Sequence, residues 1–163
     1  MIGSITLLTL VTAERVGELW LAQRNTRALL QRGGVEHAAG HYPLIVALHA
    51  LWLGGLWVLA WDLPMQVGWL ALFALLQVLR AWTLATLKGR WTTRIITVTE
   101  EVLVKRGPYR FFQHPNYAVV IGEIAALPLV FGLWQFALVF SFLNGAALFV
   151  RIRAENRALA ALR

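Results

Sequence analysis

The sequence predicts an all-α integral membrane protein, and three observations lead to that prediction. Hydrophobic residues make up 59% of the 163 residues and charged residues only 14%, which is too little polar surface for a soluble domain. The apolar residues gather in five runs, most of them long enough to cross a hydrocarbon layer of about 30 Å as helices. Most lysines and arginines lie between or after these runs, as in membrane proteins.

The expected membrane helices are about five, and they form a single domain over residues 1–163. In chain order they are residues 2–22, 44–61, 67–87, 117–131 and 134–150. The first run lacks the basic start and the small-residue cleavage site of a signal peptide, so we expect it to be a retained helix. The fourth run is short for a full crossing, and we expect it to form a helical hairpin with the fifth. Residues 151–163 then predict a C-terminal amphipathic helix with a basic side and an apolar side.

The positive charge of the chain has a membrane explanation. The net charge is +7, which could indicate nucleic-acid binding, but the basic residues fall between apolar runs and not on a polar domain. The segments after the first, third and fifth runs are basic, whereas the links after the second and fourth contain no lysine or arginine. By the positive-inside rule the N-terminus lies outside and the tail lies in the cytoplasm. We therefore expect a bacterial inner-membrane protein that contacts membrane lipids and no nucleic acid.

Metal and thiol chemistry find little support in the sequence. The absence of cysteine excludes disulfides, cysteine-ligated zinc and thiol catalysis. His37 and His41 have the spacing of two ligands on one helix face, but Gly40 and Pro43 disfavour a helix there. We expect no metal site.

Charged residues inside the apolar runs are candidates for function, because a charge in the membrane is costly. Glu14 and Glu18 are one helical turn apart, and they either pair with arginines such as Arg80 or contact a substrate. Glu123 could pair with Arg80 or Arg151, or contact a charged ligand. Both alternatives remain open at this stage.

The stretch "RGPYRFFQHPNY", residues 106–117, is the polar exception in an apolar chain. Gly107 and Pro108 predict a turn, and Pro115 biases His114 toward an extended backbone. Two stiff points within eight residues would hold the polar and aromatic side chains between them in a defined shape. This stretch therefore predicts a ligand pocket at the membrane surface.

These residues also carry a family resemblance. The segment "LVKRGPYRFFQHPNY" (103–117), the apolar hairpin after it and "RIRAEN" (151–156) resemble the isoprenylcysteine carboxyl methyltransferase family. That family's pattern is G-P-Y-R-x-x-R-H-P-x-Y, then two helices, then R-x-x-x-E-E. The segments "ERVGELWLAQRN", "RGGVEH" and "HYPLIVALH" are similar to a bacterial branch, linked to type III polyketide synthases, that O-methylates alkylpyrones and alkylresorcinols.

The resemblance implies that S-adenosyl-L-methionine binds within residues 88–163, between the His-Pro-Asn-Tyr turn and the tail. The residues that it implies for the cofactor are Tyr109, His114, Pro115, Asn116, Tyr117 and Glu155. Arg151 would lie near the reacting group of the substrate, and His114 or Glu123 could act as a base for a phenol. This chain departs from the family pattern at Gln113, which replaces an arginine, and at Asn156, which replaces a glutamate.

The function implied is an S-adenosylmethionine-dependent O-methyltransferase acting on a lipophilic acceptor. The acceptor would be an alkylpyrone or alkylresorcinol lipid, or an isoprenylcysteine carboxylate. One alternative is an NADPH-dependent membrane reductase of the sterol-reductase type, but those enzymes usually continue with a Lys-Tyr-Gly pattern that this sequence lacks. The other is a non-catalytic membrane adaptor in which the polar stretch only anchors helices.

Overall fold

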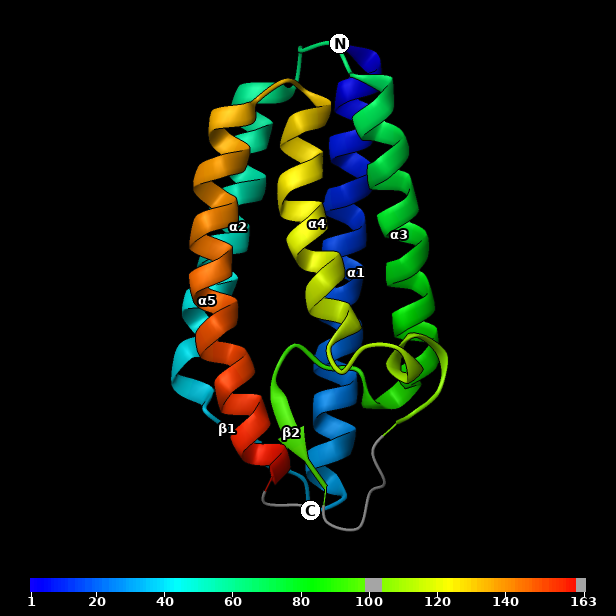
Figure 1. Ribbon diagram of the computed structural model, residues 1–163, viewed down its shortest axis with the longest axis vertical. Coiled ribbons are helices and arrows are strands. Elements are labelled where there is room, and N and C mark those ends of the chain that lie inside the picture. Colours follow the sequence, from blue (N-terminus) through cyan, green and yellow to red (C-terminus); the bar gives the residue numbers. More distant parts are fainter. Residues whose placement is uncertain (99–103, 161–163) are drawn as a thin grey trace.

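The computed structural model describes residues 1–98 and 104–160 and confirms the all-α membrane fold (Figure 1). Five helices run up and down in sequence order, each antiparallel to the one before. They are α1 (Ile2–Gln31), α2 (Tyr42–Ala60), α3 (Val67–Leu87), α4 (Pro115–Val130) and α5 (Trp134–Ala160). The expected hairpin of the last two helices is present, with residues 131–133 as its turn.

Short elements gather at one end of the bundle. Strands β1 (Val35–His37) and β2 (Ile95–Thr97) form a two-stranded antiparallel sheet in which Glu36 is paired with Ile96. Three single turns of 3-10 helix lie nearby: η1 (Ala39–His41), η2 (Lys88–Arg90) and η3 (Gly107–Arg110). We call this the basic end, and the opposite end, with the N-terminus and links 61–66 and 131–133, the turn end (Figure 1).

The structure differs from the sequence prediction in three places. Helix α1 continues to Gln31, well past residue 22, so the first part of the expected basic loop is helical. The tail does not form a separate amphipathic helix, because residues 151–160 continue α5 without a break. The β1–β2 sheet was not predicted, since its two strands are three residues each and lie some sixty residues apart in the chain.

Within the described parts of the chain, three helices are long and apolar enough to cross a membrane by length and composition: α2, α3 and α5. Helix α4 is apolar but has 16 residues, or about 24 Å at 1.5 Å per residue. Helix α1 is long, but it carries more charge than an ordinary membrane span. The bundle tolerates this charge because three of the charged side chains of α1 are paired with polar or charged side chains inside it.

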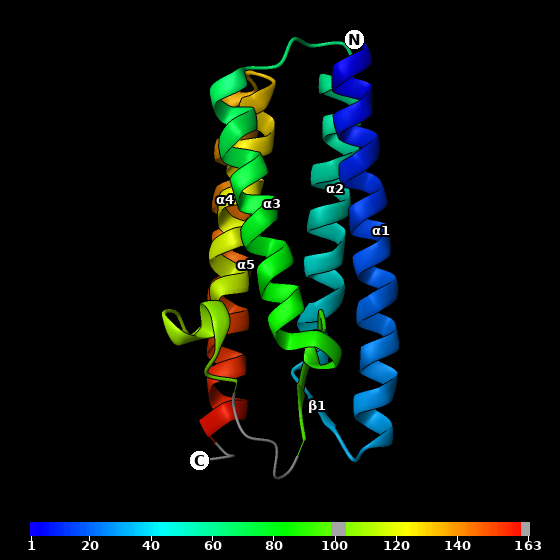
Figure 2. The ribbon, with the colours of Figure 1, turned by 90° about the vertical axis from the view of Figure 1, so that its right-hand side faces the viewer.

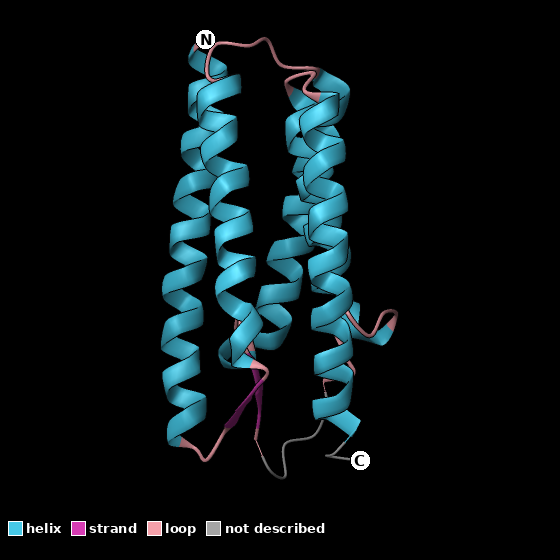
Figure 3. Cartoon of the chain, turned by 90° about the vertical axis from the view of Figure 1, so that its left-hand side faces the viewer, coloured by secondary structure: helices cyan, strands magenta, loops and turns pink. Residues whose placement is uncertain are grey.

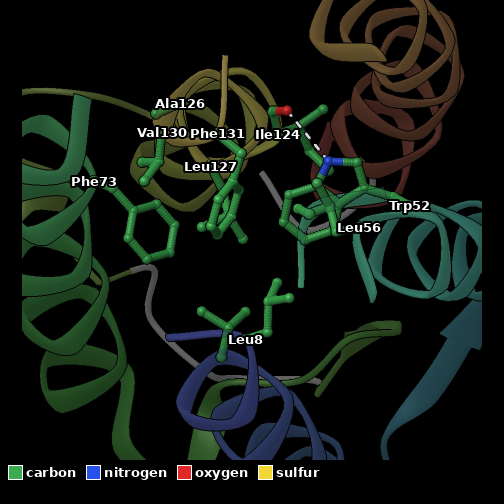
Figure 4. Packing of buried hydrophobic residues seen from close by; sticks show 11 residues of the cluster. Leu8, Trp52, Leu56, Phe73, Ile124, Ala126, Leu127, Val130 and Phe131 are labelled. Atoms are coloured by element: carbon green, nitrogen blue, oxygen red, sulfur yellow. Dashed lines mark hydrogen bonds between the residues drawn. The ribbon is translucent and has the colours of Figure 1, made fainter. Parts of the chain in front are cut away.

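The helices form two layers. Figures 2 and 3 show α1 and α2 on one side and α3, α4 and α5 on the other. Between them lies a core of large apolar side chains, nearest the turn end, with the indole of Trp52 donating a hydrogen bond to the carbonyl of Ile124 (Figure 4). The core residues are Leu8, Val11, Trp52, Leu56, Ala60, Phe73, Ile124, Ala126, Leu127, Val130 and Phe131.

Hydrogen bonds at the turn end align the helices with one another. The amide of Gln66 donates to the carbonyl of Val130 at 2.7 Å, and the hydroxyl of Ser4 donates to the carbonyl of Leu63. The last turn of α4 and the start of α1 therefore meet the same link, 61–66. It follows that the α4–α5 hairpin reaches the same level as the other helices at this end.

Charged side chains join the two layers further toward the basic end. Arg80 of α3 pairs with Glu18 of α1 and donates to Glu123 of α4 at 2.7 Å. Arg15 of α1 donates to the same two carboxylates, at 2.9 Å and 3.2 Å, and Gln77 donates to Glu14 at 2.7 Å. Glu18, Arg80 and Glu123 are at most 8% exposed. We call Glu14, Arg15, Glu18, Gln77, Arg80 and Glu123 the ion cluster; its glutamates pair with arginines or with Gln77.

Replacing Arg80 with methionine should destabilise the protein strongly. The change leaves two buried carboxylates with one arginine between them, and breaking such a buried pair costs about 3–5 kcal/mol. Thermal unfolding of the detergent-purified protein should show a much lower midpoint for Arg80→Met than for Arg27→Met, which removes an exposed arginine of α1. Equal midpoints for the two variants would show that the ion cluster does not hold the layers together.

Candidate functional site

A cavity of about 910 Å³ opens at the basic end, in the size range of small-molecule sites. Its wall comes from the ends of α1 and α3, the segment through β2, the stretch around η3, the start of α4 and the last turns of α5. The lining residues are Leu29, Leu87, Arg90, Trp91, Thr92, Arg94–Val98, Val104, Lys105, Tyr109, Arg110, Gln113, His114, Asn116, Tyr117, Arg151, Glu155, Asn156 and Ala160.

The 107–117 stretch has the stiff shape that its prolines and glycine predict. Gly107 has a φ of +57°, and a Cβ there would lie 2.5 Å from the hydroxyl of Thr86, so only glycine fits this turn. Pro108 accepts the backbone hydrogen bonds of the next turn, and Pro115 is the first residue of α4, where its missing N–H is harmless. The His114 carbonyl accepts hydrogen bonds from the amides of Tyr117 and Ala118, which fixes the entrance of the chain into α4.

A chain of polar contacts joins the start of α4 to the last turns of α5. The hydroxyl of Tyr117 donates to Glu155, and Nε of Arg151 donates to the same hydroxyl at 2.8 Å. The Arg151 guanidinium also lies over the Tyr117 ring, 5.7 Å from its centroid. Because Tyr117 and Arg151 are buried, this link orients the carboxylate of Glu155 at the cavity wall.

His114 makes a second link between the same two helices. Its Nε2 lies 3.1 Å from Oδ1 of Asn156, and its ring stacks on that of Tyr117 with centroids 5.3 Å apart. Nδ1 is 3.8 Å from Glu155. The residue that departs from the family pattern, Asn156, therefore supports the imidazole in place of a second carboxylate.

Two buried polar atoms on the cavity wall have no hydrogen-bond partner among the residues that the structure describes. They are the indole N–H of Trp91, a donor, and Oδ1 of Asn116, an acceptor. Leaving such an atom unsatisfied costs about 1–3 kcal/mol, so a ligand that bonds to it gains that amount. A polar ligand that carries both an acceptor and a donor would supply the missing hydrogen bonds of these two atoms.

The cavity is mostly cationic and aromatic. Among its described lining residues Glu155 is the one carboxylate, whereas Arg90, Arg94, Lys105, Arg110 and Arg151 are basic. The pKa of Tyr109 is raised well above its usual value, chiefly by burial and also by the negative charge of Glu155. Tyr109 is thus a neutral phenol at physiological pH and cannot serve there as a base.

The sheet closes one side of the cavity, and sequence reasoning missed it. Arg94 pairs with Glu36 at 2.7 Å and lies over the ring of Tyr42, 4.6 Å from its centroid. His37 of β1 bonds with the hydroxyl of Thr97 at 2.7 Å. The only signal in the sequence was the β-branched run "TTRIITV", which is typical of a strand but does not identify its partner.

The structure brings most of the sequence-predicted residues together. Tyr109, His114, Asn116, Tyr117, Arg151 and Glu155 all line the cavity. Pro115 does not line it, although it starts the helix that holds two of them, Asn116 and Tyr117. Glu123 lies elsewhere, bound to Arg80 and Arg15 within the ion cluster, and is not among the cavity-lining residues. The structure therefore separates Glu123 from the other residues predicted for catalysis.

Comparisons with known proteins relate this chain to a protein family. The model of the isoprenylcysteine carboxyl methyltransferase (ICMT) family matches residues 69–161, which include nearly all of α3, the whole of α4 and α5, and most of the cavity wall. The chain is also 37% identical over 158 residues to "Uncharacterized protein YpbQ" of Bacillus subtilis (strain 168), with 94% of each chain covered. No solved structure matches the chain.

Replacing Tyr117 with phenylalanine should destabilise the protein by about 1–3 kcal/mol. The change leaves the ring in place but takes the acceptor from Arg151 and the donor from Glu155, both of which are charged. Tyr42→Phe is the matched control, because it removes a hydroxyl that bonds only to the neutral Thr93. If thermal unfolding shows equal losses for the two variants, the Tyr117 hydroxyl does not hold α4 against α5.

Proposed function

The chain belongs to the isoprenylcysteine carboxyl methyltransferase family and is a membrane methyltransferase, and from that premise we propose its cofactor, acceptor and working residues. The cofactor is S-adenosyl-L-methionine, and the reaction is methyl transfer to an oxygen of a lipophilic acceptor. The observation that supports this most directly is the cavity at the basic end, with its single described carboxylate and its two unpartnered polar atoms.

The residues of the cavity fit the functional groups of this cofactor. S-adenosylmethionine carries an ammonium, a carboxylate, a sulfonium and an adenine ring with hydrogen-bond donors and acceptors. Glu155 complements the ammonium, and Arg110 or Arg151 complements the carboxylate. Aromatic faces, such as Tyr109, suit the sulfonium. The free N–H of Trp91 and the free oxygen of Asn116 match an adenine edge, which presents ring acceptors beside an amino group.

When bound, this cofactor supplies a methyl group that is electrophilic because it is attached to positively charged sulfur. The protein's part is to hold the acceptor oxygen in line with that group, and positioning of this kind can lower a barrier by several kcal/mol. Arg151 is held rigidly by Tyr117 at the cavity wall and can orient an anionic acceptor oxygen. A carboxylate acceptor needs no base, because it is already ionised at neutral pH.

A phenolic or enolic acceptor would use His114. It is the one histidine among the described cavity-lining residues, and Asn156 fixes the orientation of its ring. Glu123, the other base expected from the sequence, is committed to two arginines, so we do not assign it a role in proton transfer. Tyr109 stays a neutral phenol because its pKa is raised, so we do not assign it the role of a base.

The acceptor is a long-chain lipid, because the cavity lies where membrane helices end. Large apolar side chains such as Phe142 and Val139 are exposed on the outer surface of α5, which is the surface that lipid tails contact. A lipophilic acceptor in the bilayer can therefore reach the basic end along the outer surface of the helices. The segments of the first half that resemble the polyketide-linked branch favour an alkylpyrone or alkylresorcinol over an isoprenylcysteine.

The basic end faces the cytoplasm in this proposal. Links 61–66 and 131–133 at the turn end contain no lysine or arginine, whereas the described segments of the basic end are rich in both. The positive-inside rule then puts the N-terminus outside and the cavity on the cytoplasmic side of a bacterial membrane. A water-soluble cofactor made in the cytoplasm has direct access to a cavity there.

Replacing Glu155 with glutamine should weaken binding of S-adenosylhomocysteine at least about tenfold, because a charge-assisted hydrogen bond is worth about 1.5–3 kcal/mol. Calorimetric titration of the detergent-purified protein measures this. Glu14→Gln, which removes a carboxylate of the ion cluster, should bind the ligand like the unaltered protein. Saturable binding of NADPH in place of S-adenosylhomocysteine would make the protein a reductase, and binding of neither would favour the adaptor.

Replacing Trp91 with phenylalanine should weaken S-adenosylhomocysteine binding by about fivefold or more, because a bond to the unsatisfied indole N–H is worth about 1–3 kcal/mol. A benzene ring is kept at this position, while the five-membered ring of the indole is lost together with its unpartnered N–H. Trp20→Phe is the control, since Trp20 is 64% exposed on α1, outside the cavity. If titration finds the same affinity for both variants, the indole of Trp91 does not contact the ligand.

A further inference from the structure

A second cavity, of about 690 Å³, lies beside the first at the basic end. It is bounded by the last turns of α1, the end of α3 with η2, and residues 104–106. Six of its lining residues are basic: Arg24, Arg32, Lys88, Arg90, Lys105 and Arg106. None of the described lining residues is acidic. Cations from three separate parts of the chain thus surround one concave space.

A buried amide holds these parts together. Asn25 is 5% exposed, and its side-chain amide donates to the carbonyl of Lys88 at 3.2 Å and to that of Trp91 at 2.8 Å. Both acceptors belong to the segment that leaves α3. Asn25 therefore fixes the end of α3 against α1, with Arg24 and Lys88 on the wall of the same cavity.

The third part is held by the glycine turn. Gly107 packs against Thr86 so closely that a Cβ would overlap the threonine hydroxyl. This contact brings Lys105 and Arg106 to the end of α3. The gathering of positive charge is thus a product of specific packing, whereas free side chains would separate by repulsion.

Lys88 adopts a backbone conformation that costs energy. Its φ is +52°, a region where glycine is favoured and a residue with a Cβ is strained by about 1–3 kcal/mol. A glycine follows directly at position 89, so the chain places the charged residue, and not the glycine, at the strained position. Such an arrangement is typical of a residue kept for contact with a ligand.

We propose that this second cavity binds a phosphate group. Arg24, Lys88, Lys105 and Arg106 surround one concavity, and an anion with several oxygens can accept charge-assisted hydrogen bonds from more than one of them. At the end of membrane helices the phosphate comes from the headgroup of an anionic lipid or from a soluble phosphorylated compound. Basic pockets between membrane helices favour lipid headgroups of this kind.

The site adjoins the proposed methyltransferase site and shares part of its wall, including Arg90 and Lys105, but it also has basic residues of its own. Arg24, Lys88 and Arg106 line the second cavity and not the first. The proposal therefore does not depend on the cofactor, and loss of phosphate binding can be measured in protein that still binds S-adenosylhomocysteine.

The test is native mass spectrometry of the protein in neutral detergent with added phosphatidylglycerol or phosphatidylcholine, together with titration of inorganic phosphate. The unaltered protein should retain phosphatidylglycerol in preference to phosphatidylcholine if lipid is the source, or bind inorganic phosphate if the source is soluble. The variant Arg24→Gln/Lys88→Gln/Arg106→Gln should lose that binding by about a hundredfold, at about fivefold per charge. The control Arg27→Gln/Arg157→Gln removes two exposed charges outside both cavities and should keep it.

Lys88→Gly separates ligand binding from folding. It relieves the backbone strain, so the thermal midpoint should stay the same or rise while phosphate binding weakens about fivefold. Equal affinity of the unaltered protein and the triple variant for both probes would overturn the proposal, as would a Lys88→Gly protein that binds both probes unchanged.

Discussion

The pairing of Arg80 with Glu18 and Glu123 is the interaction on which the rest of the structure depends. In the apolar interior of a membrane protein, a charge is tolerated only when it is partnered, and here the partners lie on three different helices. The network therefore fixes the rotation of α1, α3 and α4 about their axes, which apolar packing alone specifies weakly. The apolar core lies to one side of it, and the cavities lie to the other.

Once α4 is fixed in this way, its first turn is fixed as well, and the cavity takes shape around it. His114 and Tyr117 reach across to α5, where the side chains they meet are themselves ordered by those contacts. The first turn of α4 thus forms part of the cavity wall through Asn116 and Tyr117. The packed helices thus make the protein rigid, and the residues of the candidate site lie at the end of the bundle. The same division occurs in enzymes whose functional residues lie on loops of a rigid scaffold.

The sequence allowed most of the helices to be predicted, and it failed where the cause was not local. Apolar runs reveal α2, α3 and α5 because the bilayer selects for them directly. Helix α1 was predicted too short, because the basic residues that begin at Arg24 were interpreted as a loop, whereas the helix continues through them to Gln31. The pairing of β1 with β2 joins segments some sixty residues apart, and no local pattern contains that information.

The candidate site was predictable only in part, because some of its features depend on residues that are distant in the chain. A motif places His114, Tyr117 and Glu155 in one region, and the structure puts them on one wall. It could not reveal that the Trp91 indole and the Asn116 amide lack partners, because that depends on every neighbour they have. Nor could it decide between the two partners open to Glu123, and the structure places that residue with arginines on α1 and α3.

The continuity of α5 has a mechanical consequence. Its 27 residues make a rod of about 40 Å, longer than the hydrocarbon layer of about 30 Å, with no proline or other break between its lipid-facing part and Arg151. A rod of this kind answers a thinner or thicker bilayer by tilting as a whole. Arg151 and Glu155 belong to this rod and are bonded to Tyr117 of α4, so a change in tilt would move this part of the cavity wall relative to the parts that α1 and β2 contribute.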